Sequence, residues 1–183
     1  MTALAALELG DAPQAWERLG FDVHEGRCRI GATELSLTGA GGGIAGWTLR
    51  ADGDAPPQPA PQHPNGAIKL DHLVMTTPDL AATIAELEGK GLELRRVREA
   101  GEGRRQAFFR LGETLLEVVG PAGEQTELWG LTVVVEDLDA LATRLGDDLG
   151  TIRDAVQPGR RIATVRPSAG CGVPLAFMSK PIQ

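Results

Sequence analysis

The sequence lacks several features that would place it among secreted, nucleic-acid-binding or membrane-spanning proteins. Its 183 residues hold two cysteines, Cys28 and Cys171, which are too few for a disulfide framework. Acidic residues (25) outnumber lysine and arginine (18), and the net charge of −7 argues against nucleic acid as a partner. No apolar run reaches the roughly 18 residues that cross a bilayer. We therefore expect a cytoplasmic protein without a membrane partner.

Proline and glycine, by contrast, are frequent enough to divide the chain. The apolar start contains Glu8 and has no basic residue, so we expect a strand there, not a signal peptide. Residues 51–66 are rich in proline, and they cannot sustain a helix or a sheet. His63 lies among them, beside Pro64, and is expected to be solvated. The predicted parts are a reduced N-terminal module (1–50), a Pro-rich linker or loop (51–66), a central module (67–122) and a C-terminal module (123–183).

The central module has the element order β-α-β-β-β. Asp79 is a plausible N-cap for an amphipathic helix that ends at the glycines 89–91. Strands are expected over 92–99, 105–111 and 114–119. Gly112-Glu113 separates the last two, and glycine in the first position favours a type II′ hairpin turn. The module is thus a complete supersecondary unit.

Parts of this unit recur later in the chain. Gly159-Arg160-Arg161 repeats Gly103-Arg104-Arg105 at an offset of 159 − 103 = 56 positions, and Arg153-Asp154-Ala155 repeats Arg98-Glu99-Ala100 at an offset of 153 − 98 = 55. Several matches in order at a nearly constant offset indicate a duplicated unit. The N-terminal part reads as a third copy in which one strand is almost missing. The fold class is therefore α+β, with repeated modules.

The predicted hairpin fixes which side chains share a face. The turn pairs Leu111 with Thr114, and hence Phe108 with Glu117. Gln106, Phe108 and Arg110 then lie on the face of Glu117, whereas the opposite face is apolar. In the first strand of the module, His72 faces opposite to Leu73 and Met75 because strand side chains alternate. A mixed face of this kind suits a ligand pocket with a few polar anchors.

Three strings in this arrangement resemble the vicinal oxygen chelate superfamily, which includes glyoxalase I, bleomycin-resistance proteins and extradiol dioxygenases. The strings are Leu70-Asp71-His72-Leu73-Val74 with Pro78-Asp79-Leu80, Trp16-Glu17-Arg18-Leu19-Gly20-Phe21, and Leu115-Leu116-Glu117-Val118-Val119-Gly120-Pro121. The resemblance implies that paired modules curve into a cup, where a divalent metal binds small molecules with adjacent oxygens. It implies His72 and Glu117 as metal ligands and catalytic groups, and as substrate-binding residues Phe108, Arg110, Gln106, Thr132 and Phe177.

The chain also departs from the family pattern. Aligning the modules places Gly130 at the position of His72, and Phe177 or Ser36 at that of Glu117. Two strong ligands remain, whereas catalytic zinc usually has three from the protein. The cofactor is thus either a divalent ion (Zn, Mn, Fe, Ni or Mg) or none.

Three functions follow from these alternatives. The chain is a lyase, isomerase or dioxygenase, a metal-free binding or sequestering protein, or a degenerate module whose edges form a homodimer. The arginine pairs 104–105 and 160–161 either clamp an anionic substrate or are exposed.

Overall fold

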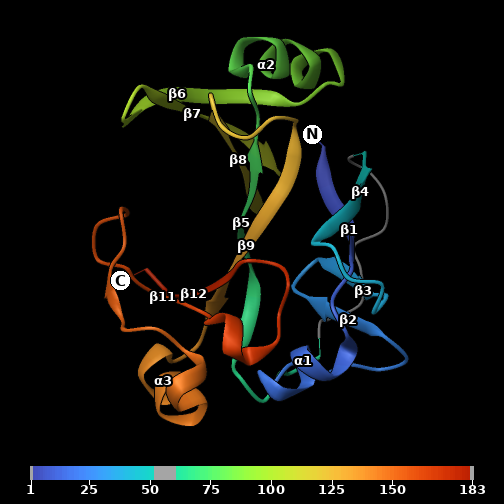
Figure 1. Cartoon of the computed structure of the whole chain (residues 1–183), viewed down its shortest axis with the longest axis vertical. Coiled ribbons are helices and arrows are strands. Elements are labelled where there is room, and N and C mark those ends of the chain that lie inside the picture. Colours follow the sequence, from blue (N-terminus) through green and yellow to red (C-terminus); the bar gives the residue numbers. More distant parts are fainter. Residues whose placement is uncertain (1, 52–60, 182–183) are drawn as a thin grey trace.

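Two β-sheets and three α-helices form the described part of this computed structural model, residues 2–51 and 61–181 (Figure 1). Residues 52–60 of the expected linker lie outside it. The larger sheet has eight strands in the order β10-β11-β12-β9-β5-β8-β7-β6, and the smaller has four in the order β2-β3-β1-β4. The fold class is α+β, as the sequence predicts.

The central segment forms one half of the eight-stranded sheet. Strand β5 runs parallel to β8, and β7 pairs antiparallel with both β8 and β6. Asp79 caps α2 through its side chain, which accepts a hydrogen bond from the backbone N–H of Ala82. The elements are β5 Ala67–Thr76, α2 Leu80–Gly89, β6 Glu93–Gly101, β7 Arg104–Leu111 and β8 Thr114–Gly120.

The C-terminal segment repeats this topology in the other half. Strand β9 is parallel to β12, and β12, β11 and β10 follow one another antiparallel, as β8, β7 and β6 do. The two halves join where β5 and β9 pair antiparallel. The elements are β9 Glu127–Val135, α3 Leu138–Leu145, β10 Arg153–Asp154, β11 Arg161–Thr164 and β12 Leu175–Ser179.

The N-terminal segment has the same element order in a shortened form. Strand β1 is parallel to β3, and β2 is antiparallel to β3, so this sheet has one strand fewer on that side than the other two segments. Strand β4 pairs antiparallel with β1, as β9 does with β5. The elements are β1 Ala3–Leu9, α1 Pro13–Arg18, β2 Arg27–Ile30, β3 Thr33–Leu37 and β4 Ile44–Arg50.

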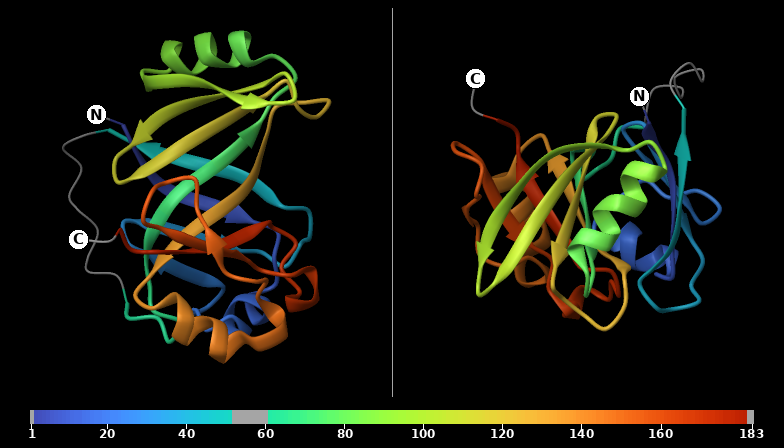
Figure 2. Two further views of the ribbon diagram at one scale, coloured as in Figure 1. Left: turned by 90° about the vertical axis from the view of Figure 1, so that its left-hand side faces the viewer. Right: turned by 90° about the horizontal axis from the view of Figure 1, so that it is seen from above.

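One hydrophobic core joins the two sheets. Helix α2 and helix α3 lie at opposite ends of the molecule, and the small sheet contacts the large one between them (Figures 1 and 2). The core contains Leu73, Leu116 and Val133 from the large sheet and Trp16 and Leu35 from the N-terminal segment. The other face of the curved large sheet is therefore left to form a site.

The prediction that His63 is solvated is wrong. The side chain is buried, Nδ1 accepts a hydrogen bond of 3.0 Å from the backbone N–H of Asp22, and Nε2 lies 2.9 Å from the carbonyl oxygen of Arg29. Burial, the largest influence, lowers the pKa of His63 and outweighs the opposing effects of Arg29 and Asp22. A proline-rich neighbourhood indicates a loop, but it does not indicate whether that loop packs against the core.

Within the described residues, no helix is both long enough and apolar enough to span a membrane.

Candidate functional site

A cavity of about 590 Å³ lies between the two halves of the large sheet. Its walls come from β5, β6, β7 and β8 on one side and from β11, β12 and the segment 153–158 on the other. We call it the cup. His72, Gln106, Phe108 and Glu117 all line it, so four of the seven predicted site residues lie together.

The β7–β8 hairpin brings three of these residues into the cup. Its register pairs Leu111 with Thr114 and Phe108 with Glu117, as predicted. Gly112 has φ +66°, which fits the first position of a type II′ turn. Gln106 donates a hydrogen bond of 2.5 Å from Nε2 to Oε1 of Glu117, so one Glu117 oxygen already has a protein donor.

Three arginines give the cup a basic wall. Arg98 donates a hydrogen bond of 2.6 Å from Nε to Oε1 of Gln106. The guanidinium groups of Arg96 and Arg98 lie 4.6 and 5.1 Å from the ring centroid of Phe108, within cation–π range. Arg153 faces them from β10. Across residues 2–51 and 61–181, none of the three forms an ion pair with a carboxylate.

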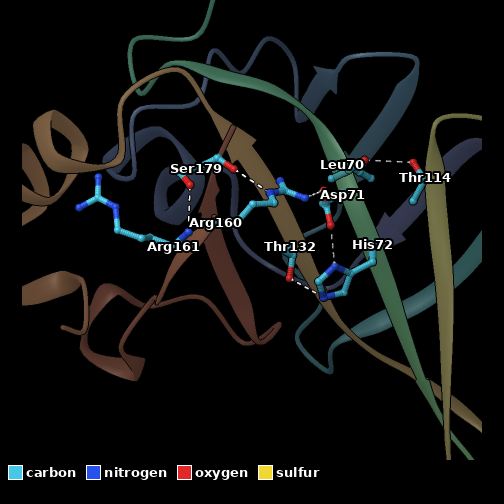
Figure 3. Close-up of polar contacts among 8 residues, drawn as sticks. All are labelled: Leu70, Asp71, His72, Thr114, Thr132, Arg160, Arg161 and Ser179. Atoms are coloured by element: carbon cyan, nitrogen blue, oxygen red, sulfur yellow. Dashed lines mark hydrogen bonds and ion pairs between the residues drawn. The ribbon is translucent and has the colours of Figure 1, made fainter. Parts of the chain in front are cut away.

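A β-bulge determines how His72 is held. Leu70 pairs with Val133 and His72 with Thr132, so Asp71 is an extra residue on β5. A bulge re-aims side chains, and here Asp71 and His72, adjacent in sequence, contact each other. Oδ2 of Asp71 lies 3.1 Å from Nδ1 of His72 (Figure 3).

The contacts of Asp71 and His72 continue in both directions (Figure 3). Oδ1 of Asp71 accepts a hydrogen bond of 2.6 Å from Nη1 of Arg160, whose Nε donates to the carbonyl oxygen of Ser179. Nε2 of His72 lies 3.0 Å from Oγ1 of Thr132. Burial alone raises the pKa of the Asp71 carboxyl, but the hydrogen bonds from His72 and Arg160 outweigh it and hold that pKa below its usual value. Asp71 is therefore a carboxylate at neutral pH.

The donor set does not fit a divalent metal. Among the described residues there is no group of three or more His, Cys, Asp or Glu side chains that could hold one. Both ring nitrogens of His72 are within hydrogen-bond distance of protein oxygens, and Glu117 is hydrogen-bonded to Gln106. Structural zinc has four protein ligands and catalytic zinc three, more than these two residues supply.

Three predicted substrate contacts do not line the cup. Phe177 is fully buried and stacks on Phe21 at 5.8 Å between ring centroids, so it lies in the core. Its neighbour Met178 lines the cup instead, because a shift of one residue in a strand alignment moves every side chain to the other face. Arg110 is exposed near the end of β7 and is not among the residues that line the cup. Thr132 is buried beside His72, its partner across β5 and β9, and does not line the cup.

Several site residues escaped the sequence interpretation, among them Asp71, Arg96, Arg98 and Arg153. Arg160 was considered as a member of an arginine pair that either clamps an anionic substrate or is exposed, yet its side chain is 11% exposed and contacts Asp71. One signal for Asp71 was available. Leu70 and Leu73 are both apolar although they are three positions apart, and a regular strand cannot place two such residues on one face. Both are buried, which the extra residue makes possible.

Comparison with solved structures finds methylmalonyl-CoA epimerases. The enzyme from Mycobacterium tuberculosis has a TM-score of 0.53 and 21% identity over 64% of this chain and 91% of its own. Another methylmalonyl-CoA epimerase has a TM-score of 0.52 and 23% identity over 63% and 97%. A Streptomyces coelicolor variant in complex with 2-nitronate-propionyl-CoA has a TM-score of 0.52 and 20% identity over 62% and 95%. No protein-family profile and no curated protein matches the chain.

These epimerases belong to the vicinal oxygen chelate superfamily, and at this identity they establish similarity of fold. Nearly the whole of each epimerase is covered, whereas over a third of this chain lies outside the match. The chain therefore has the glyoxalase-like βαβββ fold, extended by further structure of its own.

Proposed function

We propose that this protein binds a small organic anion in the cup, without a protein-held divalent metal, and acts on it as an isomerase-type enzyme. The observation that carries the proposal is the basic wall of Arg96, Arg98 and Arg153, which has no carboxylate partner in the described structure. Guanidinium groups bind carboxylate and phosphate through paired hydrogen bonds. A local cluster of arginines in a chain of net charge −7 concentrates anions at one place.

The ligand class follows from the rest of the lining. Phe108 and Met178 supply apolar surface, while Gln106 and Glu117 supply polar contacts. A carboxylate or phosphate ester with a carbonyl group beside it satisfies both. Methylmalonyl-CoA, bound by one of the epimerases of similar fold, combines these groups and is the first probe to use.

Calorimetric titration with methylmalonyl-CoA tests the proposal. We expect binding to weaken with salt, because screening reduces the attraction of exposed charges. Arg96→Ala is expected to weaken binding about tenfold, the effect of losing one charge-assisted contact of 1.4 kcal/mol. Arg95→Ala is the matched control, since Arg95 is adjacent in β6 but pairs with Glu93 and does not line the cup. Equal effects of the two substitutions would contradict the proposal.

The proposal that the cup binds its ligand without a protein-held metal has a separate test. Protein purified without chelator should contain less than one equivalent of any divalent metal, and EDTA should leave the affinity unchanged. Stoichiometric metal that is lost in His72→Ala would contradict it.

A sequestering protein is the alternative, and turnover separates the two. Loss of the α-proton of methylmalonyl-CoA in D2O, followed by proton NMR, indicates an enzyme. Binding without exchange indicates sequestration.

A further inference from the structure

Three side chains, those of Arg160, Asp71 and His72, contact one another in sequence beside the cup. Asp71 and Arg160 are each 11% exposed, and His72 is 15% exposed, measured on their side chains. The three side chains thus form a largely buried chain that ends at the floor of the cup, where His72 is one of the lining residues. Figure 3 shows Arg160 reaching across to Asp71 while the neighbouring Arg161 points away.

We propose that Arg160 and Asp71 are positioning residues that fix the neutral His72 ring with its proton on Nδ1, so that Nε2 is left without a proton and can act as a general base once a ligand replaces its contact to Thr132. This inference rests on the proposed function of the cup. A carboxylate can only accept hydrogen bonds, and Oδ2 of Asp71 lies 3.1 Å from Nδ1, so that nitrogen must carry the proton. The lone pair of the ring is then on Nε2, which accepts from the Thr132 hydroxyl at 3.0 Å when no ligand competes.

Arg160 determines which oxygen of Asp71 contacts the His72 ring. Its Nη1 donates to Oδ1 of Asp71, which keeps the carboxylate ionised and leaves Oδ2 for the ring. Because Arg160 precedes β11 and Asp71 belongs to β5, the contact forms only when the two halves of the large sheet are assembled. The carboxylate that orients the base is therefore itself held by the half of the sheet that contains neither residue.

The reaction that this geometry serves is a proton transfer next to a carbonyl group. The ligand C–H bond breaks, its proton bonds to Nε2, and its electron pair moves onto the carbonyl oxygen to give an enolate. The enolate is stabilised by the arginines of the cup, and the imidazolium by Asp71. Return of the proton to the original face only regenerates the ligand. If the enolate turns over in the cup first, the imidazolium returns the proton to the opposite face, which restores the neutral ring and completes an epimerisation. No other reactant is required.

The tautomer can be read directly by ¹⁵N NMR of the histidine rings. The chain has three histidines, and the His72→Gln variant identifies the signals of His72 by their absence. At a pH at which the ring is neutral, we expect Nδ1 protonated and Nε2 unprotonated. A wild-type ring that carries its proton on Nε2 overturns the inference, and this result is independent of any ligand.

Asp71→Asn is designed to reverse the tautomer without removing the side chain. Arg160 can only donate, so it selects the amide oxygen of the new side chain and turns the amide NH₂ towards Nδ1. The ring proton is then expected on Nε2. Asp139→Asn is the matched control, because Asp139 also pairs with an arginine, Arg161, but at the surface. Retention of the wild-type tautomer in Asp71→Asn overturns the inference.

Exchange of the methylmalonyl-CoA α-proton in D2O gives the catalytic readout. We expect the rate at saturation to fall about 10²- to 10⁴-fold in His72→Gln and in Asp71→Asn, while the dissociation constant stays within about threefold of wild type. If methylmalonyl-CoA does not bind, the proposed function fails in that form and the NMR result still decides the tautomer. Binding and exchange that are unchanged in Asp71→Asn overturn the role of Asp71.

Discussion

The carboxylate of Asp71 and the guanidinium of Arg160 lie 2.6 Å apart and connect the two halves of the large sheet. Asp71 is the extra residue of a bulge in β5, and Arg160 immediately precedes β11. Both side chains are largely shielded from water, so each depends on the other for compensation of its charge. The pair therefore affects both the assembly of the fold and the floor of the cup.

Removal of one member of the Asp71–Arg160 pair should lower the free energy of unfolding. Arg160→Leu leaves the largely buried Asp71 carboxylate without its cationic partner, and loss of one partner of a buried pair costs about 3–5 kcal/mol. We expect the free energy of unfolding at pH 7, measured in urea, to fall by about this amount. Arg161→Leu is the control, since its ion pair with Asp139 is exposed, and it should unfold at the wild-type midpoint.

Acid should remove the difference between wild type and Arg160→Leu. The pKa of Asp71 is lower in the folded protein than its ordinary value of 3.8, so the unfolded chain takes up the proton first as the pH falls. The stability that the pair supplies is complete above that value and is lost as the pH passes below it through the folded-state pKa. Urea titrations of both proteins from pH 7 to pH 3 measure the effect. A constant difference across this range would contradict the assignment.

His63 should give a second pH dependence, in a higher range. Its pKa is lowered in the folded state from 6.5, chiefly by burial, so the unfolded chain binds the proton more readily. Stability is complete above pH 6.5 and declines as the pH falls below it towards the folded-state pKa. Thermal melts between pH 8 and pH 5 measure this slope. His63→Gln cannot titrate and should flatten it, whereas His24→Gln, at an exposed histidine, should leave it unchanged.

Much of the fold could be predicted because local signals agreed with the tertiary structure. Gly112-Glu113 specified a two-residue turn, and the turn alone fixed the pairing of Phe108 with Glu117. The N-cap at Asp79 and the repeat around Arg160 likewise depend on short stretches of chain. Turn chemistry and repeated order therefore gave the hairpin and the duplicated topology.

The parts of the site that were missed depend on partners distant in sequence. The bulge at Asp71 is stabilised by contacts to Arg160, 89 positions away, and no local pattern names that partner. Phe177 was assigned to the cup from an alignment of two modules without allowance for a register shift. His63 looked solvated because burial by the core of another segment leaves no mark on neighbouring prolines.

The two cysteines should be unreactive in the folded protein. Burial, with a smaller contribution from Asp22, raises the pKa of Cys28 to about 12, and burial followed by Asp11 raises that of Cys171 to about 12. Since the thiolate is the reactive form, Ellman's reagent at pH 8 should label neither thiol in the native state. Both should react after unfolding in guanidinium. Fast labelling of either cysteine in the native protein would contradict this prediction.

Phe177 and Phe108 should separate stability from binding, because they lie on opposite faces of the large sheet. Phe177 is fully buried against Phe21, and Phe177→Ala should lower the free energy of unfolding by about 3–5 kcal/mol through the cavity that it creates. Phe108 lines the cup and contacts Arg96 and Arg98, so Phe108→Ala should weaken methylmalonyl-CoA binding, with a smaller loss of stability because Phe108 is not part of the hydrophobic core that contains Phe177. Urea unfolding and calorimetry on both variants measure the two quantities. A Phe177→Ala protein that folds stably but no longer binds would return Phe177 to the cup and contradict the register of β12.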